Sequence, residues 1–487
     1  MTALKIGAAF LVVCAFAVVY GDGGFMPPFD PPGNGPPWTR KPNIIIFNAD
    51  EMGWGDLSSY GNPLQEWGPI DDMVLQGMRF TNFYSASSTS SPSRAGLITG
   101  VNEYSHDDGS HLPHNHGFDY VGHNLPVGNV WECEEEQWHV SSTTVPYPNP
   151  LLCYLYYGAN MIQQPFSHYG LSEKFVDDAI GFMRTAKDEK KPFFLYYGLL
   201  QPHVNLYSSN EVFRDTSKRG RYGDNIREMA WSVGAIMEEV KRLREEFNTI
   251  SIFTSVHGPG IPLCNEGGDA GVLKGGKFNF WEGGVRVPGI VTWPGHIKPG
   301  STSETVASHL DIFPTLINIA GGSLPDDRII DGIDISSALF DWSPDPQPEP
   351  VTRLIKNKEH KENNEPRLLV FYCSDSVYAV RYGSYKFHFI SHKTMTKEEI
   401  HAEPGLCGDA GYPLQQNLGC RACGPNPRLP ADCIREHDPP LMYNIDADPN
   451  EAYPLDVTLS HHEAVFDEMM LKLDEFKADM NFGPPLL

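Results

Sequence analysis

The segment Asn43-Ile44-Ile45-Ile46-Phe47-Asn48-Ala49-Asp50-Glu51-Met52-Gly53 joins an apolar run to an acidic turn that contains glycine. A short, continuous apolar run is typical of a strand that is buried on both faces, as in a parallel sheet. Carboxylates that directly follow such a strand lie at the carboxyl edge of the sheet, where open α/β sheets bind ligands. The segment therefore predicts an α/β fold with a site near Asp50 and Glu51.

Helices and strands are predicted to alternate beyond this segment. Apolar residues recur at helical spacing over 175–183 and 226–243, and each stretch is followed by a short apolar run, at 193–197 and 250–254 respectively. This alternation predicts a mainly parallel sheet with helices on both faces. We interpret the apolar positions of the two helices as core packing.

Composition and charge divide the chain into five segments. Proline and glycine are concentrated near the N-terminus, and a charged stretch interrupts the second half of the chain. Two apolar, strand-like runs and a closing helix at 462–477 follow that stretch and predict a smaller α+β domain. The predicted segments are a signal peptide (1–21), a Pro/Gly-rich linker (22–42), a catalytic-type α/β domain (43–350), a charged linker (351–365) and a C-terminal α+β domain (366–487).

The N-terminus predicts export from the cell. Lys5 precedes an apolar run from Ile6 to Tyr20, as in a secretory signal peptide, and a membrane anchor is the alternative interpretation. Eight of the nine cysteines lie beyond this run, and an even number in an exported protein predicts disulfides. Four cysteines at 407–433 could instead hold a structural zinc ion. Because the chain has no Asn-x-Ser/Thr sequon, we expect secretion rather than glycan-dependent delivery to lysosomes.

The charge balance excludes two classes of partner. The chain carries 62 acidic and 37 basic residues, a formal net charge of −25. Such a chain repels nucleic-acid phosphate and anionic membrane surfaces. A site for an anionic ligand must therefore be a local positive pocket.

A series of motifs runs in order along the chain. Ser90 to Gly100 reads SSPSRAGLITG, which resembles the signature of sulfatases, in which Cys, any residue and Pro-Ser-Arg precede a short helix and Thr-Gly. The chain is therefore similar to the sulfatase family, and most similar to its animal arylsulfatases. The resemblance implies an alkaline-phosphatase-like fold and hydrolysis of sulfate esters. The supporting motifs are Asp50–Asp56, His116–Asp119, Pro192–Tyr197, Gly275–Lys277, Trp281–Arg286, Trp293–Ile297, Asp311–Leu316 and Asp331–Asp334.

The resemblance also implies a mechanism and a set of site residues. In active members the signature cysteine is oxidised to formylglycine, which lies beside a divalent cation, usually calcium. Arginine and lysine neutralise the sulfate oxygens and histidine assists the leaving group. The catalytic positions implied here are Ser90, Arg94, His203 and Lys277, and the implied metal positions are Asp50, Glu51 and His257.

Three features depart from the family pattern. Position 90 is serine, which has no second hydroxyl group with which to expel sulfate. The first metal pair, Asp-Asp in the family, reads Asp50-Glu51, and glutamate reaches one methylene further. The second pair, Asp-Asn in the family, reads Val256-His257; valine cannot bind a metal, and imidazole suits zinc better than calcium. Several tens of residues that carry a family lysine and histidine are absent between Gly100 and Val101. We expect the lost strand to belong to the interior of the sheet.

Three functions remain open at this point. The first is a secreted sulfatase-like protein with little or no catalysis, which acts as a binding or matrix component. The second is an arylsulfatase that acts on a sulfated small molecule or glycan by a serine-derived route. The third is a phosphoesterase with a serine nucleophile and a zinc ion, for which Val256 is unfavourable because a carboxylate ligand is needed there.

Overall fold

The computed structural model describes residues 40–98, 113–125, 154–203, 206, 210–326, 330–340, 366–373, 376–393 and 434–479. The predicted signal peptide, the charged linker, the four cysteines at 407–433 and the Gly100–Val101 junction lie outside these ranges. Within them, no helix has both the length and the apolar character needed to cross a membrane.

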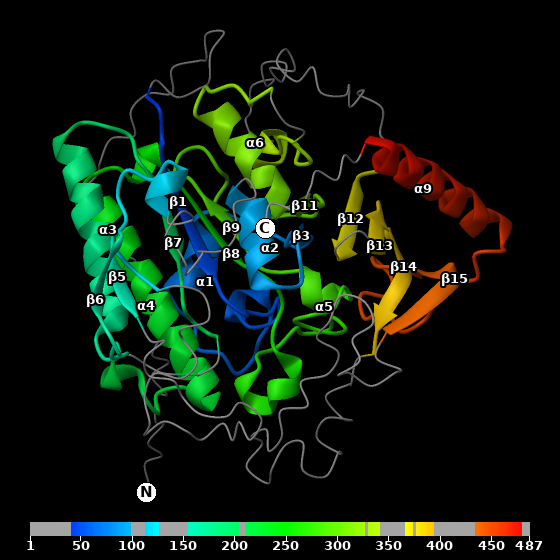
Figure 1. The fold of residues 1–487 in the computed structure, drawn as a ribbon, viewed down its shortest axis with the longest axis horizontal. Coiled ribbons are helices and arrows are strands. Elements are labelled where there is room, and N and C mark those ends of the chain that lie inside the picture. The colour runs from blue at the N-terminus through cyan, green and yellow to red at the C-terminus, as the bar shows by residue number, and fades with distance from the viewer. Residues whose placement is uncertain are drawn as a thin grey trace, which may run out of the picture. The chain divides into compact units, whose positions relative to one another are not determined.

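A six-stranded, mostly parallel sheet forms the centre of the fold (Figure 1). Its strands run in the order β10-β2-β9-β8-β1-β7, and β1 pairs in parallel with both β7 and β8. β9 is antiparallel to β8 and to β2, so the sheet is mixed. The strands are β1 (Asn43–Ala49), β2 (Met78–Phe80), β7 (Phe194–Gly198), β8 (Thr249–Ser255), β9 (Gly289–Thr292) and β10 (Ser301–Ser303).

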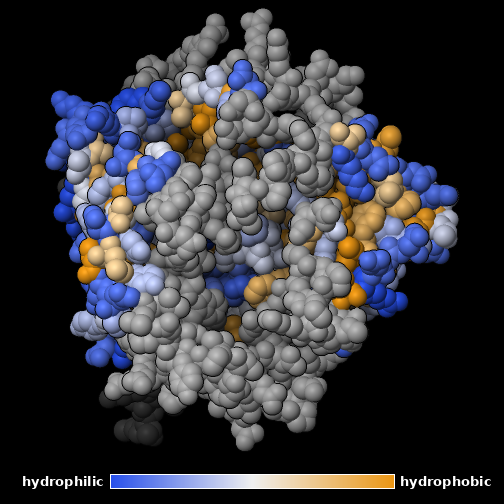
Figure 2. Space-filling view, in the orientation of Figure 1, coloured by the Kyte–Doolittle hydropathy of each residue, from blue (hydrophilic) through white to orange (hydrophobic). Residues whose placement is uncertain are grey.

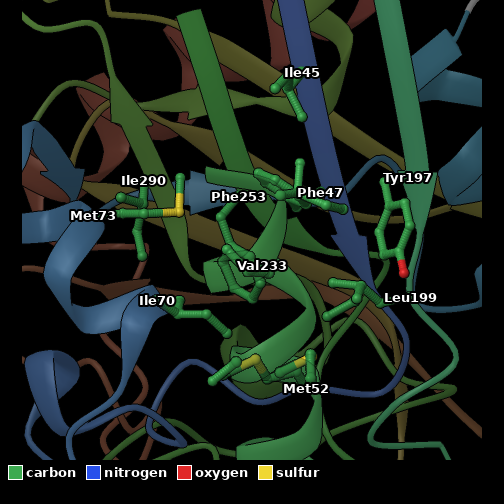
Figure 3. Packing of buried hydrophobic residues seen from close by; sticks show 14 of the residues in the cluster. Ile45, Phe47, Met52, Ile70, Met73, Tyr197, Leu199, Val233, Phe253 and Ile290 are labelled. Carbon is green, nitrogen blue, oxygen red and sulfur yellow. The ribbon is translucent and has the colours of Figure 1, made fainter. Parts of the chain in front are cut away.

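One face of this sheet packs against three helices. The helices are α1 (Pro69–Gln76), α3 (Leu171–Asp188) and α4 (Gly220–Arg242). Phe47 of β1 and Phe253 of β8 point into this layer, where Val233 of α4 and Met73 of α1 meet them (Figure 3). The sequence favours this arrangement because β1 is apolar throughout and the helices carry apolar residues at helical spacing. The outer surface over α3 is mainly hydrophilic (Figure 2).

Two further helices pack together on the other face of the sheet. They are α2 (Ser90–Ile98) and α6 (His309–Ile319). His309 is fully buried, with Nδ1 3.1 Å from the hydroxyl of Ser93 on α2 and Nε2 3.0 Å from the hydroxyl of Thr254 on β8. Since Thr254 and Phe253 are adjacent in β8, their side chains point to opposite faces. His309 thereby joins α2 to the sheet.

The edge strand β7 changes our expectation about the missing segment. Among the described residues, β7 pairs only with β1, so it forms one end of the sheet. Phe194 of β7 is 41% exposed, and Phe118 lies against its ring. The described sheet is continuous from β10 to β7, so the interior gap that we expected is not present in it. Unpaired backbone groups at the edge of a sheet can be hydrated, which makes them far less costly than buried ones.

The C-terminal part contains a four-stranded antiparallel sheet of order β12-β13-β14-β15. Phe387 and Val380 from its strands pack with Met469 and Leu473 of α9 in a separate apolar cluster. These elements are β12 (Leu368–Cys373), β13 (Ser376–Tyr382), β14 (Tyr385–His392), β15 (Ile434–Asn444) and α9 (Ser460–Asp479). The short elements of the chain are β3 (Phe83–Tyr84), β4 (His123–Asn124), β5 (Leu155–Tyr157), β6 (Asn160–Gln163), β11 (Ala307–Ser308), α5 (Glu282–Val285) and α7 (Ser336–Phe340).

A buried charge cluster links α5 to the C-terminal sheet. The Glu282 carboxylate accepts hydrogen bonds from Lys386 Nζ at 2.8 Å, from the Tyr84 hydroxyl at 2.7 Å and from Arg286 at 3.3 Å. Arg381 lies 3.8 Å from the same carboxylate. Burial alone would raise the pKa of Glu282, but the charges of Lys386 and Arg381 outweigh it and lower the pKa. The carboxylate is therefore ionised inside the protein.

Candidate active site

The candidate site lies at the carboxyl edge of three adjacent strands. The strands β7, β1 and β8 run parallel and end at Gly198, Ala49 and Ser255. The segments that follow them carry His203, the pair Asp50-Glu51, and His257. The parallel register thus brings together residues that are about 50 to 200 positions apart in the chain.

The turn after β1 holds both carboxylates in fixed positions. The amide of Met52 donates to the Ser255 hydroxyl at 3.0 Å, and the amide of Asp50 donates to the carbonyl of Gln201 at 3.1 Å. Glu51 has φ 67°, in the left-handed region that glutamate seldom adopts. Such a conformation persists only where surrounding contacts hold it, and it is found most often at functional sites.

Ser90 is the first residue of α2 and faces these carboxylates. Its Oγ donates to Asp50 Oδ1 at 2.9 Å and lies 3.0 Å from His257 Nε2. His257 is fully buried, and its Nδ1 donates to the carbonyl of Gly258 at 2.8 Å. Burial and the positive charge of Lys277 lower the pKa of His257 to about 4, so its Nε2 is an acceptor at neutral pH. The single hydroxyl proton of Ser90 therefore has two acceptors within reach.

Arg94 lies one turn further along α2. Its Nη2 donates to Asp50 Oδ2 at 3.1 Å and its Nη1 donates to the Tyr196 hydroxyl at 3.1 Å. The buried Nε of Arg94 has no hydrogen-bond partner among the described residues. Burial would raise the pKa of Asp50, but the electrostatic interaction with His203 and the positive charge of Arg94 outweigh it and hold the pKa well below its usual range.

Lys277, His203 and Glu51 form a second polar group beside the first. The Lys277 ammonium pairs with Glu51 Oε1 and lies 3.2 Å from His203 Nε2, which in turn is 3.4 Å from Glu51 Oε2. The side chains of these three residues are each less than 10% exposed. Burial raises the pKa of Glu51, but His203 and Lys277 outweigh that effect and lower it. Two carboxylates thus face two cations, Arg94 and Lys277, within one cluster of side chains.

The donor set does not fit a calcium ion. Calcium takes six to eight oxygen ligands, usually from several carboxylates and carbonyls. Here the Glu51 carboxylate is engaged by Lys277, and the Asp50 carboxylate by Arg94 and Ser90. Val256 is fully buried and offers no ligand atom in its side chain. Over the described ranges, no group of three or more His, Cys, Asp or Glu side chains is arranged to hold a metal ion.

All seven residues that the sequence singled out lie in this one place, namely Asp50, Glu51, Ser90, Arg94, His203, His257 and Lys277. The contacts above join them directly, whereas their roles stay predictions. Sequence reasoning missed Tyr196 and Asn48, which extend the group: the Asn48 amide donates to the Tyr196 hydroxyl at 2.9 Å. Both occupy strand positions expected to be apolar core, and only a polar residue within an apolar run could have signalled them.

Comparison with known proteins assigns most of the chain to one family. The family model "Sulfatase" matches residues 42–114 and 108–322, and the model "C-terminal region of aryl-sulfatase" matches 364–487. The chain belongs to the sulfatase family. It is 38% identical to an arylsulfatase of Hemicentrotus pulcherrimus over 92% of this chain and 83% of that protein.

This sulfatase-family chain is also similar to a second sulfatase by sequence and to a solved sulfatase structure. It is 29% identical to N-acetylgalactosamine-6-sulfatase of Canis lupus familiaris over 92% of this chain and 88% of that protein. The crystal structure of PsFucS1 sulfatase from Pseudoalteromonas sp. superimposes with a TM-score of 0.65 at 21% identity, over 90% of each chain. The alkaline-phosphatase-like α/β fold expected from the sequence is therefore confirmed.

Proposed function

We propose that this protein binds the sulfate group of a small molecule or glycan and hydrolyses sulfate esters slowly or not at all. Its family hydrolyses sulfate esters. The proposal that hydrolysis is slow or absent in this chain rests on one observation: Arg94 is paired with Asp50, and Lys277 is paired with Glu51. The two cations that would neutralise a sulfate group are already neutralised by the two carboxylates. Among the described residues of the site, each of these cations already faces a carboxylate, which weakens its stabilisation of transition-state charge.

Two donors support binding of an anion in spite of this balance. The buried Arg94 Nε has no acceptor within the described part of the chain, and Ser90 begins a nine-residue helix whose N-terminus favours negative charge. Relatives named after arylsulfatase and N-acetylgalactosamine-6-sulfatase activities favour a sulfated small molecule or glycan as the ligand. Nucleic acid and membrane surfaces remain unfavourable partners because the net charge is −25.

Secretion is part of the same proposal. The apolar run from Ile6 to Tyr20 supports export. Cys264 and Cys373 each take part in a disulfide, which suits an oxidising compartment. We propose an extracellular binding or matrix role for the mature chain.

A serine-derived reaction is the second candidate, and the 3.0 Å contact between Ser90 Oγ and His257 Nε2 favours it. Attack of Ser90 on sulfur would form a Ser90 O–S bond, break the ester O–S bond and pass the hydroxyl proton to the leaving oxygen. Sulfate would remain attached to Ser90, because an unmodified serine cannot collapse to an aldehyde. This route gives one turnover for each molecule of protein.

Release of phenol from a generic aryl sulfate tests both candidates. We expect no steady-state release by the mature wild-type protein above a Ser90→Ala control, with or without added calcium. We also expect Ser90→Cys, co-expressed with a formylglycine-generating enzyme, to remain inactive because the pocket charges are unchanged. A burst of about one equivalent that Ser90→Ala abolishes would select the serine route. Sustained turnover by the wild type would overturn the proposal of impaired catalysis.

A further inference from the structure

Backbone hydrogen bonds hold Lys277 in a position where its ammonium group is the counterion of the Glu51 carboxylate. The Lys277 amide donates to the Pro259 carbonyl at 2.8 Å, and the next amide, that of Phe278, donates to the Ser88 carbonyl at 2.9 Å. The loop is thereby bonded to the segment after β8 on one side and to the segment before α2 on the other. Lys277 is presented to Glu51 by fixed backbone, not by a mobile surface side chain.

The approach of this loop depends on a glycine. A Cβ atom at Gly276 would lie 2.2 Å from the Pro259 carbonyl oxygen, well inside van der Waals contact. The loop can therefore lie against Pro259 only because position 276 has no side chain. The same close approach brings the Lys277 ammonium to a carboxylate whose side chain is only 5% exposed.

Among the described residues, each of the two carboxylates on this side of the site has a cationic side chain as partner. Glu51 is held by Lys277 and faces His203, and Asp50 is held by Arg94. A buried carboxylate needs a cationic partner. Here the chain supplies a cationic partner for each carboxylate. Val256 and His257 occupy the two positions at which the family has the oxygen ligands Asp and Asn.

We propose that the Lys277 ammonium takes the place of a divalent cation at Glu51, so that the folded site is complete without metal and takes up no calcium. This inference does not depend on whether the chain hydrolyses sulfate esters. It makes the Glu51–Lys277 pair a structural requirement of the pocket, and it makes added calcium or a chelator irrelevant to the folded state.

A double-mutant cycle with calcium titration tests the proposal on the full mature chain. We expect the wild type to show no change in Tm and no binding heat with calcium chloride or EDTA. Lys277→Met and Glu51→Gln should each lower Tm by several degrees, and the double variant should lose clearly less than the sum of the two. The control cycle uses the exposed pair Lys191 and Glu189, whose partners are 71% and 51% exposed and should show no coupling.

A reconstructed metal shell provides the positive control. The triple variant Glu51→Asp, Val256→Asp, His257→Asn restores the family's four oxygen-donating residues and should gain a calcium-dependent rise in Tm. Calcium-dependent stabilisation of the wild type would overturn the proposal, and so would strict additivity of the Lys277 and Glu51 variants. If Lys277→Met does not fold, titration of the wild type with calcium still decides the outcome. Aryl sulfate turnover is a separate measurement, so either conclusion can fail without the other.

Discussion

His309 shows how one buried side chain fixes the position of the candidate nucleophile. Its two ring nitrogens contact hydroxyls on different elements, Ser93 of α2 and Thr254 of β8. Ser93 is three residues after Ser90, so the same contact sets the depth of Ser90 above the sheet edge. An imidazole with both nitrogens engaged in an apolar layer is favoured in its neutral form.

Replacing His309 tests whether this buried, neutral imidazole stabilises the fold. Burial lowers the pKa of His309 from 6.5 to about 3. Between these values the unfolded chain binds a proton that the folded chain does not, so the free energy of unfolding falls as the pH drops through this window. We expect His309→Gln to be less stable than wild type by about 1–3 kcal/mol at neutral pH. The difference should shrink towards pH 4 in urea-unfolding experiments, and a constant difference would contradict the argument.

At the scale of elements, the sequence predicted the strands and helices that have strong apolar patterns. The run at 43–48 became β1, the runs at 193–197 and 250–254 became β7 and β8, and the stripe at 226–243 became α4. The antiparallel direction of β9 was not predicted, because a buried apolar run carries no information about direction.

The candidate site was predictable only in part. The family resemblance placed seven of its residues but missed Tyr196 and Asn48. It also gave no sign of the pairing of Glu51 with Lys277, which joins loops 226 positions apart. No local pattern encodes such a contact, since it depends on the path of the 275–277 turn past Pro259.

Gly276→Ala tests the turn as an element. The added Cβ would meet the Pro259 carbonyl oxygen at 2.2 Å, so the loop must shift and Lys277 must move with it. Overpacking of this kind costs about 1–3 kcal/mol, and we expect a lower Tm in thermal unfolding. Gly181→Ala is the matched control, because its Cβ would have no neighbour within 4 Å and it lies inside α3. The control should be slightly stabilised, by about 0.5–1 kcal/mol. Equal effects of the two changes would contradict the steric account.

At the scale of the whole molecule, the cluster around Glu282 ties α5 to the C-terminal sheet. Lys386 and Glu282 are both fully buried, so removing one partner leaves a charge inside the protein without its counterion. Such a change typically costs about 3–5 kcal/mol. The loss of stability should affect both sheets, since Glu282 belongs to the first part of the chain and Lys386 to the second.

We therefore expect Lys386→Met to lower the denaturant midpoint of β1 and β14 together. Hydrogen exchange measured on peptides from both strands would show one shared transition in wild type and variant. Lys191→Met, at an exposed position, should shift the midpoint by no more than about 0.5 kcal/mol in free energy. Loss of protection in β14 alone would show that the two sheets unfold independently.

The Glu282 cluster also has a consequence for synthesis on the ribosome. Glu282 emerges 104 residues before Lys386, and Arg381 appears only shortly before that lysine. At about 5–20 residues per second, the nascent chain spends roughly 5–20 s in which Glu282, a carboxylate destined for the interior, has Arg286 nearby but neither Lys386 nor Arg381. The contacts that tie α5 to the C-terminal sheet cannot form during that interval. A chain that stops before β14 would be a substrate for chaperones and proteases, not a shortened working protein.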